Sequence, residues 1–450
     1  MKSKNLLILA AIVLVVAAYV FFFERHQPTS EEARDRAEKV LQDFDRDAVI
    51  SIEIEGGNGR VRLERTGEEW RLREPLDYPA DTSKVSSTLA SLANLEADRR
   101  LGADEIDPAA YGLDEPDLSV EMRTAEDEVI ALVIGDEMPL GSKRALRLGE
   151  GGEIVLASGW FVDDLDREVD EWRSREVVDV SVDQVASIDI EASGDHIKAV
   201  RVNDEWKLLS PLEDLADPDH LLALVSELDS LRIEEFLSEG VSPADLGLDA
   251  PEYEIVLVRS DGLEPLRLDL GATRDGEGGT EVACRRGDSE YFWALDRVRT
   301  RLSKAPVLWR AKKVGAFDTW DAAGLVMSRS EATVRLEREN GMWRFADDGA
   351  EVDQGEVQDR LSKLAGLEAT DFDLVAPLTA EMGRIGVALP AGGEEPEAPT
   401  LSFTFFEPLT EGGRAMVRVS GRETVMGIDA AAVEAILGDL EGLRAKSAEE

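Results

Sequence analysis

The chain has 450 residues, of which 43% are hydrophobic and 32% charged. This apolar content supports packed cores and excludes a globally disordered chain. The formal net charge is −45, from 95 acidic and 50 basic residues. Such a surface repels phosphate backbones, so we exclude nucleic acid as a partner. The single cysteine, Cys284, excludes an intrachain disulfide, and the alternating strand around it predicts a buried thiol.

The N-terminal residues predict a membrane anchor. An uninterrupted apolar stretch, Leu6–Phe23, follows Lys2 and Lys4. As a helix it would be about 27 Å long, close to the hydrocarbon thickness of a bilayer. The preceding positive charge predicts a cytoplasmic N-terminus and a single-pass membrane protein, with the bulk of the chain outside the cytoplasm. A cleaved signal peptide is the alternative. We expect 1–25 to be a cytoplasmic tip and transmembrane anchor and 26–46 to be a charged stalk.

An internal repeat of about 136 residues organises the rest of the chain. The tryptophans Trp70, Trp206 and Trp343 follow this period. Each copy also places four apolar residues at helical spacing: Val85, Leu89, Leu92 and Leu95; Leu221, Val225, Leu228 and Leu231; Val357, Leu361, Leu364 and Leu367. We therefore predict repeat 1 at 47–180, repeat 2 at 181–316 and a divergent repeat 3 at 317–450.

The predicted fold class is α+β, with an N-terminal single transmembrane helix followed by the three tandem repeats. Each repeat is expected to contain antiparallel strands, one amphipathic helix and a second helix. The strands alternate in hydrophobicity without a βαβ rhythm, which favours sheets with one face covered by helices.

The clearest motif is WRLREPLDYPAD, Trp70 to Asp81, which returns as WKLLSPLEDLAD and as the weaker WRFADDGAEVD. Its closing acids, Asp81, Asp217 and Asp353, each precede the first apolar helical residue by four positions. This is where an N-cap accepts hydrogen bonds from the free amides of the first turn. We interpret the three acids as helix caps, with a metal or catalytic role as the alternative.

The other repeated residues are interpreted as structural. The tryptophans are expected to pack in the cores, with ligand stacking as the alternative. Pro75 and Pro211 are expected to end strands because proline lacks an N–H donor. The remaining motif, GLD-x-P, reads as a turn followed by an extended segment and contains Gly112, Pro116, Gly247 and Pro251.

Templates for catalysis and cofactors are missing from the sequence. There is no nucleophile elbow, no phosphate-binding loop and no dinucleotide fingerprint. The histidines His26, His196 and His220 are scattered, without zinc-site spacing. The acidic stretches 43–47 and 274–279 do not complete a calcium loop. We predict no catalytic residue, no cofactor and no metal ligand, and hence a protein that is not an enzyme.

The order of these motifs resembles a bacterial family catalogued as domain of unknown function 4340. The matching stretches are Ile52–Ile54, Trp70–Asp81, Gly112–Pro116 and Gly135, echoed at Ile188–Ile190, Trp206–Asp217, Gly247–Pro251 and Gly271. The resemblance implies an extracytoplasmic partner of an ABC-type transport system of the gliding-motility type. It implies no catalytic residues.

Three functional hypotheses follow. The first is a non-enzymatic accessory or scaffold subunit that contacts the membrane subunits of an ABC-type transporter and the lipid bilayer through Leu6–Phe23. The alternative is an extracytoplasmic binding module for a cell-envelope glycan or a cation, with Trp160, Tyr291 or Trp293 partly exposed in a pocket. The third is a hydrolase that uses two carboxyl groups with shifted pKa values.

Overall fold

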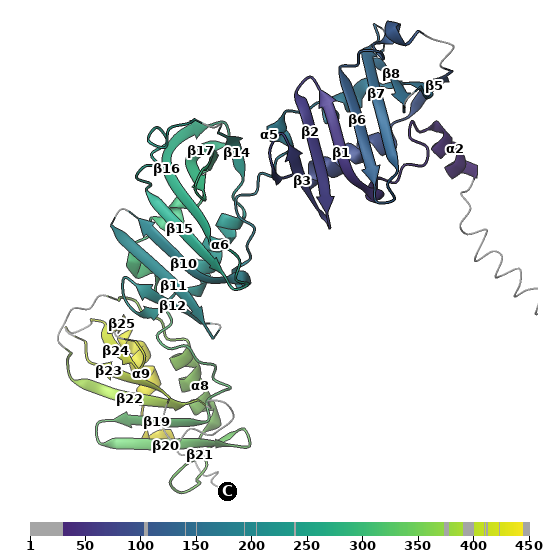
Figure 1. The fold of residues 1–450 in the computed structure, drawn as a ribbon. Coiled ribbons are helices and arrows are strands. Elements are labelled where there is room, and N and C mark those ends of the chain that lie inside the picture. The colour runs from purple at the N-terminus through teal and green to yellow at the C-terminus, as the bar shows by residue number, and fades with distance from the viewer. Residues whose placement is uncertain are drawn as a thin grey trace, which may run out of the picture. The chain divides into compact units, whose positions relative to one another are not determined.

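Figure 1 shows the fold in a computed structural model. The structure describes residues 30–443 except 103–106, 140, 150, 193, 204, 238–239, 373–377, 390–399, 409, 411–412 and 423. The chain divides into two compact units, 1–175 and 176–450. The first unit holds one large antiparallel sheet, and the second unit holds two.

The first sheet has nine strands in the order β4-β3-β2-β1-β6-β7-β8-β9-β5. Its strands are β1 (Val49–Gly56), β2 (Gly59–Thr66), β3 (Glu69–Glu74), β4 (Tyr78–Pro79), β5 (Ala97–Leu101), β6 (Leu118–Thr124), β7 (Val129–Glu137), β8 (Lys143–Leu148) and β9 (Ile154–Ser158). Its helices are α2 (Ser30–Glu38), α3 (Thr82–Asn94), α4 (Val162–Leu165) and α5 (Val169–Trp172).

Strand alternation builds the core of the first sheet. Ile52 pairs with Leu63 on β2, and Ile54 pairs with Val61. All four side chains are buried, in the same core cluster as the apolar face of α3. Because successive side chains of a strand point to opposite faces, the intervening residues of β1 lie on the outer face. The sheet therefore has one face under the helix and one charged outer face.

The second sheet repeats this strand order, β13-β12-β11-β10-β15-β16-β17-β18-β14. Its strands are β10 (Val185–Ala192), β11 (Asp195–Val202), β12 (Glu205–Ser210), β13 (Asp214–Leu215), β14 (Ile233–Phe236), β15 (Tyr253–Arg259), β16 (Leu266–Gly276), β17 (Gly279–Arg286) and β18 (Glu290–Leu295). Its helices are α6 (Pro218–Asp229) and α7 (Arg299–Leu302).

The third sheet is smaller, with seven strands in the order β21-β20-β19-β22-β23-β24-β25. Its strands are β19 (Gly324–Arg329), β20 (Ala332–Glu339), β21 (Met342–Phe345), β22 (Glu381–Ala388), β23 (Leu401–Phe406), β24 (Ala415–Val419) and β25 (Met426–Ile428), and its helices are α8 (Gln354–Ala365) and α9 (Ala430–Leu437). Single bridges, Arg344↔Glu351 and Asp371↔Gly427, stand where the other two sheets have their short edge strands.

The fold class predicted from the sequence is wrong. The described residues form three large antiparallel sheets with few helices, instead of a transmembrane helix followed by repeats that each combine antiparallel strands with an amphipathic helix and a second helix. Among them, no helix is both long and apolar enough to cross a membrane. The predicted anchor, 1–25, lies outside the described residues, as does 26–29 of the predicted stalk.

The expected second helix shows why the prediction failed. In the first two sheets it shrinks to single turns such as α5 and α7, each of four residues. After α5 the chain is extended: Arg173 bridges to Ala80, and the Ser174 amide donates to the Pro79 carbonyl. These residues give the short edge strand β4 partners for its backbone groups, which an edge otherwise leaves unpaired.

Candidate functional site

The second and third sheets meet along a connecting segment, residues 310–317, inside the second unit. The Ala311 amide donates to the carbonyl of Leu215 in β13, at 2.8 Å. On its other side the segment bonds to the chain after α8: the Val314 amide donates to the Leu367 carbonyl at 2.9 Å, and Ala369 donates to Lys312 at 2.7 Å. The segment is therefore tied by backbone hydrogen bonds to both sheets.

A buried ion cluster fixes this junction. The side chain of Asp214 is fully buried between Arg310 and Arg422, whose side chains are only 1% and 2% exposed. Arg310 Nε lies 2.5 Å from one carboxylate oxygen of Asp214, and Arg422 Nε lies 2.6 Å from the other. Buried charges are tolerated when they are paired and hydrogen-bonded, as here.

The two arginines also bind the third sheet and the connecting segment. Arg422 donates to the carbonyls of Lys313 and Val314, at 2.6 and 3.2 Å. The guanidinium of Arg310 lies 4.4 Å from the ring centroid of Phe372 and donates to the Thr424 hydroxyl. Removing Asp214 would leave both cations without their anion, so the cluster depends on all three side chains to link the two sheets.

The first sheet has a different arrangement at the corresponding positions. Tyr78 stands where Asp214 stands, as the register of β3 and β4 shows. Arg173, which follows Trp172 as Arg310 follows Trp309, lies 4.3 Å from the centroid of the Tyr78 ring. A cation–π contact thus occupies the place of the buried ion pair.

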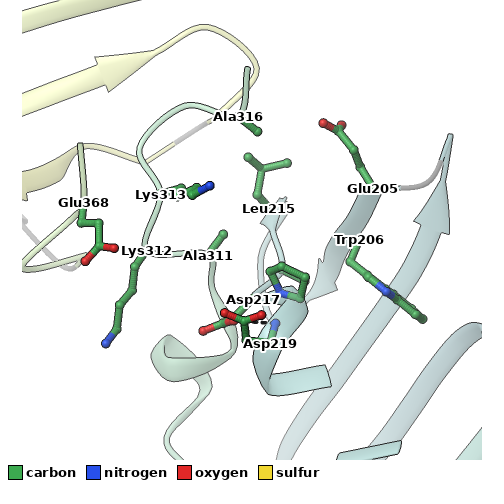
Figure 2. A pocket seen from close by; sticks show the side chains of 12 residues that line it. Glu205, Trp206, Leu215, Asp217, Asp219, Ala311, Lys312, Lys313, Ala316 and Glu368 are labelled. Carbon is green, nitrogen blue, oxygen red and sulfur yellow. Dashed lines mark hydrogen bonds between the residues drawn. The ribbon is translucent and has the colours of Figure 1, made fainter. Parts of the chain in front are cut away.

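A groove of ≈ 480 Å³ runs beside this junction. Figure 2 shows Glu205 and Trp206 on the side of the second sheet, and Lys312, Lys313 and Glu368 on the other. A second hollow of ≈ 510 Å³ shares Glu205 with the first. Glu205, Lys312, Lys313 and Glu368 are exposed, whereas Trp206 is only 8% exposed.

The chemistry of the groove differs from that of a typical small-molecule site. Such sites are enclosed and mostly apolar, with few polar groups. Here the lining is mixed, because apolar side chains such as Leu215 and Ala316 stand beside charged side chains of both signs; the hollow is open, and the one aromatic ring is largely covered. Asp217 is already occupied, because its carboxylate accepts from the amides of Asp219 and His220 at 3.0 and 3.2 Å. The groove therefore differs from an enclosed small-molecule pocket in its openness and in the number of charged groups along it.

The structure does not bring the repeated motif residues together into one site. Trp70 and Trp343 are 4% and 3% exposed and belong to separate cores. Asp81 caps α3 by accepting from the Lys84 amide at 3.0 Å, and Asp353 caps α8 by accepting from Glu356 at 3.1 Å. Only Trp206 and Asp217 border the groove.

The prolines and glycines of the motifs lie at ends of elements. β3 ends at Glu74 and β12 at Ser210, each followed by a proline in a cis peptide bond, Pro75 and Pro211. Gly112 has φ of 69°, and a Cβ there would lie 2.6 Å from the Asp136 carboxyl group. Gly247 has φ of 65°. Pro116 and Pro251 stand two residues before β6 and β15.

The outer face of the second sheet holds a cluster that the sequence analysis did not single out. The ligand atoms of Asp189, Glu191 and His196 all lie within 4.8 Å of one another. His196 Nε2 lies 2.7 Å from Asp189 Oδ1. Partial burial would raise the pKa of Asp189, but hydrogen bonds from Lys198 and His196 lower it overall. The cross-strand register of the β10–β11 hairpin was the signal that could have found this cluster.

His220 is a buried histidine at the start of α6. Burial, reinforced by the positive charge of Lys304, lowers its pKa to about 4. Its Nδ1 lies 3.1 Å from the Lys304 ammonium, and its ring meets Trp309 edge-on at 4.5 Å. His220 is thus neutral at pH 7 and packed in the core. His26 lies outside the described residues.

The carboxyl groups with shifted pKa values do not resemble a hydrolase pair. Hydrogen bonds from Arg71 to Asp77, from Ser181 to Asp183 and from Arg259 to Asp261 lower the pKa of each acid. A general acid needs a raised pKa instead.

Of the aromatic residues expected at a glycan site, Trp160 belongs to the first unit, and Tyr291 and Trp293 lie together on β18 in the second. Trp160 is 52% exposed in the first unit. Trp293 is buried in the second unit, and the guanidinium of Arg274 lies 4.1 Å from its ring centroid. Tyr291 is only partly exposed. Cys284 is fully buried, which confirms the expected thiol environment and raises its pKa.

A family model described as "Domain of unknown function (DUF4340)" matches residues 70–251. The match starts at Trp70, the first residue of the repeated motif, and ends at Pro251, the last residue of the second GLD-x-P copy. It supports the family resemblance over this stretch. No curated protein and no solved structure matches the chain. Membrane attachment and association with a transporter stay predictions.

Proposed function

We propose that the protein is a non-enzymatic accessory subunit of an ABC-type transport complex, of the gliding-motility-like kind. Residues 6–23 attach it to the lipid bilayer of the bacterial inner membrane, with the N-terminus inside. The sheets lie on the periplasmic side, where the groove beside the Asp214 cluster receives a segment of a membrane subunit of the transporter.

The observation that carries the proposal is the fixed junction beside an open, charged groove. The buried contacts of Asp214 with Arg310 and Arg422 hold the two sheets together before any partner binds. A partner that contacts both walls of the groove then binds at a lower cost in free energy, because the groove is already ordered. This preorganisation favours an interaction surface for a macromolecule.

Charge supports the same assignment. The groove offers Lys312 and Lys313 beside Glu205 and Glu368. Charges of both signs at exposed positions contribute to the choice and orientation of a partner more than to affinity. The surrounding surface, with a net charge of −45 for the chain, disfavours nucleic acid and anionic headgroups.

The test is purification of the full chain from detergent-solubilised membranes after mild crosslinking. We expect the membrane subunits of an ABC-type transporter to co-purify with it. A chain that lacks 1–25 serves as the control and should lose most of the associated subunits. Recovery of the full chain alone would count against the proposal.

A further inference from the structure

The β10–β11 hairpin arranges potential metal ligands by its register. Glu191 stands directly opposite His196, and Asp189 stands opposite Lys198. On the other side of β10, Glu254 of β15 stands opposite Glu191. Side chains at directly opposite positions have Cβ atoms about 5 Å apart. Three carboxylates and one imidazole therefore share a small area of the outer face.

The same positions in the first sheet carry ordinary charge compensation. There Glu55 stands opposite Arg60, and Glu53 opposite Arg62. Arg60 forms an ion pair with Glu53 at 2.5 Å. The position of Glu254 is occupied by Ser119. Two acids and two permanent cations balance each other, and no imidazole is available.

The second sheet changes the charge of this pattern at two positions, and both changes favour a cation site. An arginine is replaced by His196, whose imidazole binds metals when neutral. A serine is replaced by Glu254, which adds a negative charge. With the imidazole neutral, Asp189, Glu191 and Glu254 carry three negative charges against the single positive charge of Lys198. A divalent cation would neutralise the excess.

We propose that Asp189, Glu191 and His196 bind a divalent transition-metal cation of the zinc type on the outer face of the second sheet. The imidazole and carboxylate donors suit Zn²⁺, whose usual ligands include both groups. His196 is 42% exposed, so the ion has access from solvent. Lys198 Nζ holds Asp189 Oδ2 at 2.7 Å and leaves Oδ1 directed toward His196.

Lys198 orients Asp189 in this site, and Glu254 adds a further negative charge next to Glu191. Partners behind the ligands hold the coordinating oxygen in place and contribute to affinity. The third sheet offers no counterpart, because Ser328 pairs with Thr333 and Val326 with Arg335 at these positions. The inference goes beyond the proposed function and does not depend on a transporter.

The test is calorimetric titration of the full chain in detergent with zinc sulfate, at physiological ionic strength and with excess Mg²⁺ to occupy other acids. We expect one zinc site per chain. His196→Ala and Asp189→Asn should each weaken binding at least about tenfold, as expected when a ligand is lost. The matched variant Glu53→Gln in the first sheet should leave binding unchanged.

A spectroscopic measurement separates coordination from general attraction to acids. With Cu²⁺ as the probe, electron paramagnetic resonance should show coupling to one nitrogen in the parent chain and none in His196→Ala. The proposal is overturned if no saturable zinc site exists, or if Glu53→Gln weakens binding as much as Asp189→Asn.

Discussion

Asp214 in β13 of the second sheet and Arg422 between β24 and β25 of the third sheet are joined by two hydrogen bonds, at 2.6 and 3.0 Å, although 208 residues separate them in the chain. Both side chains are almost completely shielded from water. This contact, together with Arg310, turns two sheets into one body and places the groove beside a fixed junction.

We predict that Asp214→Asn destabilises the second unit by about 3 kcal/mol, because removal of one partner from a buried ion cluster leaves uncompensated charge. The measurement is urea unfolding of the full chain, followed at equilibrium. Asp77→Asn is the control, since Asp77 also contacts two arginines but is exposed. It should change the unfolding free energy far less than Asp214→Asn does, because exposed ion pairs contribute little to stability. Equal effects of the two variants would contradict the role of the buried cluster.

The capping acids should have a smaller and more local effect. Asp81→Ala removes the acceptor of the Lys84 amide and should cost about 1 kcal/mol. Asp81→Ser keeps an oxygen at the cap and should stay within a few tenths of a kcal/mol of the parent. Thermal unfolding of both variants checks this. A serine variant as unstable as the alanine variant would argue against capping.

The helix starts could be predicted because each depends on a local rule. A cap needs an acid at one position, and the apolar face repeats at the helical period. The fold class was harder to predict than the helix starts. Edge strands such as β4 and β13 have two residues each, too few for alternation to appear, and their partners are distant in sequence.

The contacts at the junction could not be predicted from the sequence either. With 95 acidic residues in the chain, nothing marks Asp214 as the acid that meets Arg422. The ligands of the β10–β11 hairpin were closer to prediction, because a short turn sets the register that places His196 opposite Glu191. A search for loop or helix spacing does not find ligands paired across strands.

Stability should depend on pH through His220. Its folded pKa is about 4, below the ordinary value of 6.5, so the unfolded state binds more protons between these values. Stability therefore decreases as pH falls from 6.5 to 4, by up to about 3 kcal/mol. The measurement is the difference in unfolding free energy between the parent and His220→Leu across this range. A difference that does not change with pH would refute the assignment.

Charge reversal in the groove should weaken association with the transport complex without unfolding the chain. Lys312 and Lys313 are exposed, so the double variant Lys312→Glu/Lys313→Glu should keep its free energy of unfolding within about 0.5 kcal/mol of the parent. We expect co-purified membrane subunits to fall several-fold. Lys363→Glu on α8, another exposed lysine, is the matched control and should retain them.

The most direct measurement is site-specific photocrosslinking in membranes, with a photoreactive residue placed at Lys312 in the groove. The account predicts a crosslink to a membrane subunit of an ABC-type transporter. The same residue placed at Glu331, in the exposed turn between β19 and β20, should give none. Crosslinks of equal yield from both positions, or no crosslink from Lys312, would contradict the proposal that this groove binds the transport complex.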